Sequence, residues 1–149
     1  MYKLITLFFI VAASCGTPKN TSETSSESVS ENGPIIQEGT ITLSLGETAR
    51  VGDLVIQFKE VLEDSRCPTG MQCVWQGRAK ILVETSEDGM PVDKSEIIFG
   101  RLKNGETENH TFYKRGTTTI TATAINPYPT DASGTKNLPY ALVLEIGKE

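Results

Sequence analysis

The sequence predicts an all-β domain, specifically an antiparallel β-sandwich of about seven to eight strands, with a small β-barrel as the alternative. Three observations lead to this prediction. Apolar and polar residues alternate with a period of two over several short stretches. Turn-forming pairs such as Asp88-Gly89 separate those stretches. No segment has the 3.6-residue apolar stripe of a helix that packs on a core. The chain has 149 residues, which suits one domain with a modest core.

Residues 1–14 are predicted to be a targeting segment outside the fold. Lys3 provides a positive charge, and residues 4–11 form an apolar run that is too short to span a bilayer. Small residues then precede Cys15. This arrangement resembles a bacterial lipoprotein signal, which implies that Cys15 is lipidated and becomes the first residue of the mature chain. The alternative is an ordinary secretory signal that is cut near Ser14 and leaves Cys15 as a free thiol.

Residues 15–33 are predicted to form a flexible tether that begins at the lipidated cysteine. Ser, Thr and Glu dominate this segment, so it cannot bury enough apolar surface to fold. The tether would hold the domain, residues 34–149, off a membrane. Gly16 stands where an Asp retains some lipoproteins in the inner membrane, so the resemblance favours the outer membrane.

The predicted strands follow from alternation within residues 34–149. Gly46-Glu47 ends the first strand, and a bulge is expected before Val61-Leu62. The last strand is apolar on nearly both faces, so it should lie in the centre of a sheet. The predicted strands contain residues 41–45, 54–62, 78–84, 97–99, 110–113, 117–125 and 140–146.

The connections between these strands carry the turn signals. Asp88-Gly89 predicts a hairpin, Asn104-Gly105 a second turn of the same kind, and Arg115-Gly116 a third reversal. Two longer connections, before Cys73 and after Ile125, are expected to cross from one sheet to the other. Such crossings favour the sandwich over the barrel.

Charge and cysteine content limit the classes of function. The formal net charge is −5 and the 14 Lys and Arg residues are scattered, which argues against a nucleic-acid partner. An odd count of 3 cysteines in an exported chain needs an explanation. If Cys15 carries lipid, Cys67 and Cys73 are left to form a disulfide with each other. A zinc site built from these two cysteines and the distant His110 is a poor alternative, so we expect no metal and no cofactor.

A catalytic site is not expected. His110 is the only histidine, and a lone strand histidine is typical of a surface or edge position. Glu60, Glu63 and Asp64 cluster at a predicted strand end, where solvated carboxylates are common. A small hydrolase or a calcium site that uses these acids remains an alternative.

The stretch 64–77 contains two cysteines, the only tryptophan, a proline and two glycines. Asp64-Ser65-Arg66-Cys67-Pro68, four residues, Cys73, then Trp75 and Gly77 form a pattern that resembles a group of small, uncharacterised bacterial envelope proteins, many of them apparently lipoproteins. The resemblance extends loosely to residues 126–129 and to the closing strand. It implies an envelope location and transfers no activity.

Two hypotheses compete for this stretch. In the structural one, Arg66 pairs with Asp64 or binds backbone carbonyls, the disulfide fixes the loop, and Trp75 fills one end of the sandwich. In the functional one, Arg66, Trp75 and Tyr128 form a recognition patch, because arginine and aromatic residues dominate binding hot spots. The loop would then be pre-organised by the disulfide.

The sequence therefore predicts a membrane-anchored envelope lipoprotein with a non-catalytic binding or structural domain. Its partner would be another envelope protein or a cell-wall component. The first alternative is an inhibitor of a secreted or periplasmic hydrolase that acts through the loop between Cys67 and Cys73. The second alternative is the small hydrolase.

Overall fold

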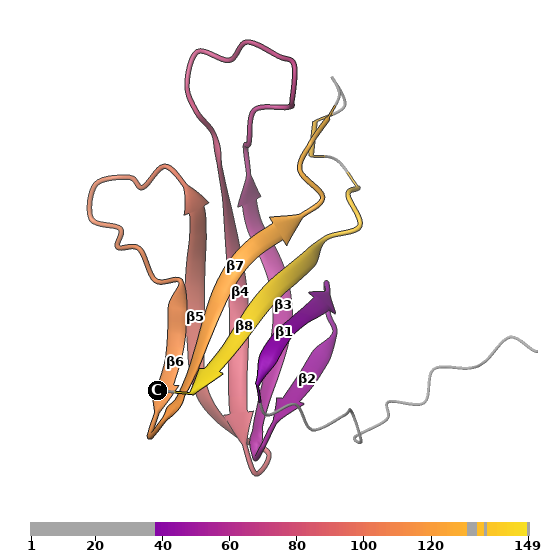
Figure 1. The fold of residues 1–149 in the computed structure, drawn as a ribbon. Coiled ribbons are helices and arrows are strands. Elements are labelled where there is room, and N and C mark those ends of the chain that lie inside the picture. Colours follow the sequence, from indigo (N-terminus) through magenta and orange to yellow (C-terminus); the bar gives the residue numbers. More distant parts are fainter. Residues whose placement is uncertain (1–37, 131–133, 136, 149) are drawn as a thin grey trace, which may run out of the picture. The chain divides into compact units, whose positions relative to one another are not determined.

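The computed structural model describes residues 38–130, 134–135 and 137–148. The predicted signal peptide, Cys15 and the predicted tether lie outside the described residues. The described part of the chain is all-β, with eight strands in two antiparallel sheets (Figure 1). The sheets are not closed into a barrel, which confirms the predicted sandwich. No helix in this part of the chain is long and apolar enough to cross a membrane.

Each sheet has four strands, and every pair of neighbouring strands is antiparallel. The first sheet has the order β1 (Gly39–Ser44), β8 (Ala141–Lys148), β7 (Thr118–Asn126) and β6 (Thr111–Arg115). The second sheet has the order β2 (Thr48–Val51), β3 (Leu54–Asp64), β4 (Arg78–Glu87) and β5 (Met90–Gly100).

The position of β8 confirms one prediction from the hydropathy pattern. This strand lies between β1 and β7, and Leu142, Leu144 and Ile146 are buried. Alternate positions between them are half-buried or exposed. Apolar residues on both faces thus correctly indicated a strand with a neighbour on each side.

Two turns and the bulge are also confirmed. Asp88 and Gly89 join β4 to β5, and both have positive φ angles, 48° and 75°. This is the backbone conformation that a two-residue hairpin of type I′ requires. Arg115 pairs with Thr118 across the tight turn between β6 and β7. The register of β3 shifts between Phe58 and Glu60, before Val61, where the bulge was expected. It shifts a second time between Val61 and Glu63.

The predicted sheet crossings were wrong. The connection that contains Cys73 joins β3 to β4, and the connection after Ile125 joins β7 to β8; in both cases the two strands are paired neighbours in one sheet. The true crossings are residues 45–47 and 101–110. Asn104-Gly105 therefore forms a turn inside a crossing rather than a hairpin. Loop length and turn residues are local properties, whereas the sheet that a strand joins depends on distant partners.

Strand β2 was not predicted. It has only 4 residues and lies at the edge of its sheet, where a single buried residue, Val51, gives almost no alternation. Strands this short carry little sequence signal.

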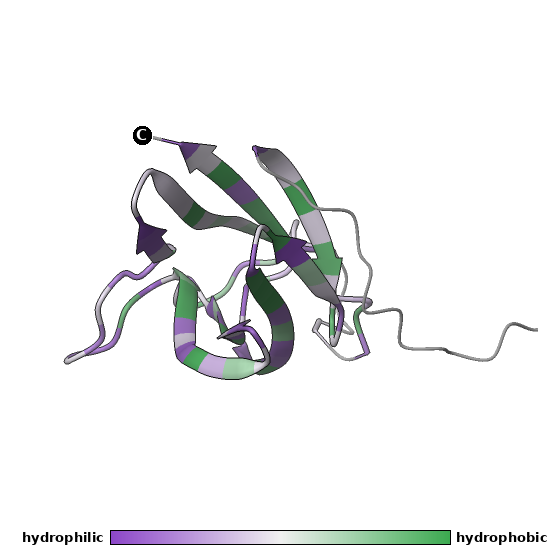
Figure 2. Ribbon diagram, turned by 90° about the horizontal axis from the view of Figure 1, so that it is seen from below, coloured by the Kyte–Doolittle hydropathy of each residue, from purple (hydrophilic) through white to green (hydrophobic). Residues whose placement is uncertain are grey.

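The core lies between the two sheets. Figure 2 shows apolar segments on both layers. Phe58, Ile81 and Val83 of the second sheet belong to the same buried cluster as Ile120 and Leu144 of the first sheet. Each such side chain contributes about 1.5–3 kcal/mol when fully buried. This cluster holds the two sheets together and fixes the ends from which the loops emerge.

Candidate functional site

Three connections lie at one end of the sandwich, which we call the loop end. They are residues 65–77 between β3 and β4, which we call the Cys loop, residues 101–110 between β5 and β6, and the connection from β7 to β8 (Figure 1). The opposite end carries the Asp88-Gly89 turn and is called the hairpin end. The loop end contains the candidate residues that the sequence singled out on two of these connections. They are Arg66, Cys67, Cys73 and Trp75 of the Cys loop, and Tyr128 just after β7.

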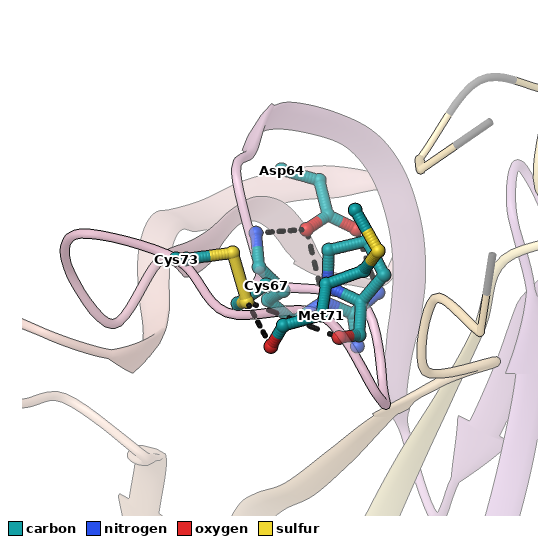
Figure 3. The surroundings of a disulfide bond; sticks show 6 residues. Asp64, Cys67, Met71 and Cys73 are labelled. Atoms are coloured by element: carbon teal, nitrogen blue, oxygen red, sulfur yellow. Dashed lines mark hydrogen bonds and ion pairs between the residues drawn. A yellow bond between two sulfur atoms is a disulfide. The ribbon is translucent and has the colours of Figure 1, made fainter. Parts of the chain in front are cut away.

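The predicted disulfide is confirmed. Cys67 and Cys73 are bonded, with their Cα atoms 6.0 Å apart (Figure 3). Inside the ring that they close, the Met71 N–H donates to the carbonyl of Pro68 at 3.1 Å. The Thr69 N–H donates to the carbonyl of Pro129 at 2.9 Å, which attaches the Cys loop to the β7–β8 connection. The ring is therefore anchored to a neighbouring segment as well as closed.

Arg66 is a buried cation that joins the two sheets, and only 7% of its surface is exposed. Its Nε and Nη2 atoms donate to the two carboxylate oxygens of Asp64 at 2.9 and 2.6 Å. Nη1 donates to the carbonyl of Ile125 at 2.9 Å, and Nη2 also donates to that of Pro127 at 3.0 Å. Arg66 thus both pairs with Asp64 and binds backbone carbonyls. The end of β3 is tied in this way to the end of β7 in the other sheet.

Asp64 is fully engaged by its neighbours. Its side chain is 3% exposed, and it accepts a hydrogen bond from the Tyr140 hydroxyl at 3.0 Å in addition to those from Arg66. Burial, together with this bond to Asp64, raises the pKa of Tyr140. The Thr135 hydroxyl donates to the backbone carbonyl of Asp64 at 2.9 Å. This carboxylate has a structural role and is not open to a substrate.

Glu63 belongs to a second ion-pair cluster. Arg78 donates to one oxygen of Glu63 from Nε at 2.9 Å and from Nη2 at 2.6 Å, and it also pairs with Glu106. The hydrogen bonds from Arg78 are the main reason that the pKa of Glu63 falls to about 2. Glu60 is exposed on the same strand. The three acids therefore form no matched acid and base, because Glu63 stays ionised and Asp64 is enclosed.

His110 lies just before β6 rather than within a strand. Its Nε2 atom is 2.7 Å from the carbonyl of Ile98, and its ring centroid is 5.1 Å from that of Phe99. Both partners belong to β5 in the other sheet. The histidine thus helps to hold the crossing between the sheets. Among the described residues, no group of three His, Cys, Asp or Glu side chains is placed to hold a metal ion.

Trp75 does not fill the end of the sandwich, and this part of the structural hypothesis was wrong. The side chain is 67% exposed, and the adjacent Val74 is 93% exposed. A Cβ atom on Gly77 would lie 1.6 Å from the carbonyl oxygen of Ser65, so the two arms of the loop touch through their backbones. At this contact the side chain of Arg66 is buried, whereas that of Trp75 is not.

Two neighbouring pockets open at the loop end. The first, which we call the Trp75 pocket, has a volume of about 400 Å³ and lies between the Cys loop and residues 101–104. The second has a volume of about 290 Å³ and is lined by Arg66, Phe99 and Tyr128 among others. Gln76 and Gly77 line both pockets. The complete lining of the Trp75 pocket is Glu63, Ser65, Trp75, Gln76, Gly77, Arg78, Arg101, Leu102, Lys103 and Asn104.

The three residues of the functional hypothesis are distributed over these two pockets. The guanidinium carbon of Arg66 lies 5.1 Å from the ring centroid of the exposed Tyr128, a cation–π contact. Trp75 lines the other pocket. Arg66 itself is buried and occupied, so it supports the surface rather than forming its exposed part.

The sequence interpretation missed the second wall of the Trp75 pocket. Arg101, Leu102, Lys103 and Asn104 come from the crossing between β5 and β6. The Asn104-Gly105 turn marked this stretch as a loop. Nothing in the sequence indicated that it would lie beside the Cys loop.

Comparison with protein-family models, with curated proteins and with solved structures finds no match for this chain. The function is therefore argued from the geometry of the loop end.

Proposed function

We propose that this chain is a membrane-anchored bacterial envelope lipoprotein whose β-sandwich binds a partner at the loop end and has no catalytic role. The signal-like segment before Cys15 and the acidic tether support the anchor. The exposed surface at the loop end supports the binding role.

The observation that carries the proposal is the exposure of Trp75 on a firmly held loop beside a pocket. An indole that is 67% exposed adds little to folding. The loop that presents it is closed by a disulfide and attached to the rest of the fold through Arg66 and Thr69. Holding a large aromatic side chain in this way reduces the conformational entropy that binding would otherwise cost.

The absence of a catalytic role is supported by the state of the acids. Arg78 holds Glu63 in its ionised form, and Arg66 with Tyr140 encloses Asp64. Neither carboxyl group is available to exchange a proton with a substrate.

A second candidate function is inhibition of a secreted or periplasmic hydrolase. The Cys loop extends beyond the ends of β3 and β4 (Figure 1), and Val74, next to Cys73, is 93% exposed. A projecting, disulfide-closed loop of this kind has the form needed to enter an active-site cleft.

Capture of partners from an envelope extract tests the binding role. The detergent-solubilised full chain would be cross-linked in the extract beside Trp75→Ala and a control variant, Met90→Ala. Met90 is 69% exposed but lies at the hairpin end, so it matches Trp75 in exposure and not in location. We expect a partner that the wild type and Met90→Ala capture and Trp75→Ala loses. Equal capture by all three would exclude recognition through Trp75.

The inhibitor hypothesis has its own measurement. Hydrolase activities of the same extract would be measured with the wild-type chain and with Cys67→Ser/Cys73→Ser. A hydrolase activity that the wild type suppresses and the variant does not would favour inhibition. Unchanged hydrolase activities would exclude it.

Fractionation of cells tests the anchor. Cys15→Ser should move the protein from the membrane fraction to the soluble fraction. Membrane association that persists in this variant would refute lipidation at Cys15.

A further inference from the structure

The Trp75 pocket has an apolar wall and a polar wall. Trp75 and Leu102 form apolar surface on two different loops that face the same space. An indole presents a flat apolar face with an electron-rich π system. A pyranose ring has a flat face of C–H groups and a rim of hydroxyls, so it can cover the indole while its hydroxyls point toward polar neighbours.

Polar side chains with unused hydrogen-bonding groups surround this apolar surface. Gln76 and Asn104 line the pocket, and within the described part of the chain their side-chain amides make no hydrogen bond to protein. Each amide offers donors and an acceptor in one plane. That combination matches a pair of adjacent hydroxyls, which also donate and accept.

The charge of the pocket selects among sugars. Its lining contains three cations, Arg78, Arg101 and Lys103, and one carboxylate, Glu63. Arg78 is paired with Glu63 and also with Glu106, and Lys103 pairs with Glu63 at 3.3 Å. In the part of the chain that the structure describes, Arg101 has no ion-pair or hydrogen-bond partner.

Of the three cations in the lining, Arg101 is thus the one whose charge is not paired within the described residues, and it occurs on a chain whose formal net charge is −5. A free guanidinium at a pocket rim is suited to a carboxylate, which it can bind through two parallel hydrogen bonds.

The size of the pocket fits this ligand class. Its volume of about 400 Å³ lies within the range of roughly 300–1,000 Å³ that is typical of small-molecule sites. Trp75, Gln76 and Arg101 are exposed, so the pocket is open to solvent and a bound sugar unit could belong to a longer glycan.

We propose that the Trp75 pocket binds a pyranose that carries a carboxylate, as one unit of an acidic glycan. The ring lies against Trp75, Gln76 and Asn104 bind hydroxyls, and Arg101 binds the carboxylate. This inference rests on the proposed binding role of the loop end and names the ligand of that site.

The test compares the binding of acidic sugars with the binding of an uncharged sugar ester of similar shape. The detergent-solubilised full chain would be titrated with trigalacturonic acid, with its methyl ester and with N-acetylmuramic acid. Calorimetry would measure affinity, and the fluorescence of Trp75, the only tryptophan in the chain, would report occupancy of the pocket. We expect binding of at least one acid, with at least tenfold weaker binding of the methyl ester and a clear loss of affinity as NaCl is raised.

Single substitutions test the contribution of each wall of the pocket to binding. Arg101→Gln should reduce acid binding about tenfold and remove the preference for the acid over the ester. Trp75→Ala should abolish binding of both, and Met90→Ala should bind like the wild type. A retained preference for the acid in Arg101→Gln would overturn the assignment of the carboxylate site.

The outcomes also separate this inference from the proposed function. Failure of both acidic sugars to bind would overturn the inference. If Trp75→Ala still lost a partner from the envelope extract, the binding role would stand with a different ligand, such as a protein. Equal affinity for trigalacturonic acid and its ester would overturn the selection for charge.

Discussion

The base and the tip of the Cys loop differ in almost every physical property. At the base, Asp64, Arg66 and Gly77 are buried or in close contact, and the polar groups of the two charged side chains have partners. In the segment that directly follows Cys73, which we call the tip, Val74 and Trp75 are exposed. The two regions are only a few residues apart in the sequence.

This difference shows how one loop can separate stability from recognition. Substitution of Gly77 at the base would create a steric clash. Substitution of Asp64 or Arg66 would leave a buried charge without its partner. The tip contains side chains that the fold does not need. The disulfide joins Cys67, next to Arg66, to Cys73, next to Val74, so it links the two regions covalently. The following predictions test this separation.

Gly77→Ala should have the largest effect on stability. The added Cβ would lie 1.6 Å from the carbonyl oxygen of Ser65, so the two arms of the loop would have to move apart. We expect the free energy of unfolding to fall by at least about 5 kcal/mol, as for the most disruptive core substitutions. Denaturant unfolding measures this loss. Gly70→Ala is the control: it carries the strain of a positive φ of 81°, but no atom lies within 4 Å of the added Cβ, so it lacks the clash. Equal stability of the two variants would contradict the close contact at the base.

Arg66→Ala should be the next most damaging change. It would leave the Asp64 carboxylate, whose side chain is 3% exposed, without its cation. Removal of one partner from a buried ion pair costs about 3–5 kcal/mol. Thermal and denaturant unfolding would be compared with those of Arg101→Ala, where an exposed arginine is lost and stability should stay within about 0.5 kcal/mol. A stable Arg66→Ala variant would mean that the base does not depend on this pair.

Cys67→Ser/Cys73→Ser should have an intermediate effect. The sequence separation of the two cysteines is 6, so the chain-entropy model gives a loss of about 2 kcal/mol. We expect a lower melting temperature with an intact fold by circular dichroism. A loss as large as that of Arg66→Ala would show that the disulfide supports the base and not only the tip.

Low pH should weaken the ion-pair cluster next to the base. The pKa of Glu63 is about 2 in the fold, below its ordinary value of 4.5. Its contribution to stability is therefore complete above about pH 4.5 and is lost as the pH falls toward 2. Urea unfolding between pH 6 and pH 2 should show a flatter loss of stability in Glu63→Gln than in the wild type, while the exposed Glu60→Gln serves as the control. Parallel curves for the wild type and Glu63→Gln would refute the role of this carboxylate.

Trp75→Ala should have the smallest effect on stability. The exposed indole makes little contact with the core, so the free energy of unfolding should change by less than about 0.5 kcal/mol. Denaturant unfolding followed by circular dichroism, which does not need the tryptophan, measures this. Destabilisation comparable to that of the disulfide variant would show that Trp75 belongs to the base.

Much of the fold could be predicted because its signals are local. The alternation within β1, β3 and β7, the Asp88-Gly89 hairpin and the bulge in β3 each depend on a few adjacent residues. The pairing of Cys67 with Cys73 followed from the count of cysteines. The central position of β8 followed from apolar residues on both of its faces.

The parts that could not be predicted depend on contacts between distant segments. Burial of Trp75 was expected because a tryptophan beside a disulfide often fills the core of a sandwich, but here the side chain of Arg66 is buried and that of Trp75 is exposed. The Trp75 pocket could not be predicted either, because it also depends on contacts between distant segments. Its two walls, around Trp75 and Arg101, come from different connections that meet only after both sheets have formed.

The antiparallel pairing of the first and last strands has a practical consequence. Gly39 at the start of β1 pairs with Ile146 near the end of β8, so the chain enters and leaves the sandwich side by side. In Figure 1 the start of β1 and the end of β8 lie away from the Cys loop. A fluorophore, a spacer or a sensor surface attached through either flank of the sandwich would therefore leave the Trp75 pocket facing free solution. The protein can be immobilised by either flank for binding measurements without covering the site that is being measured.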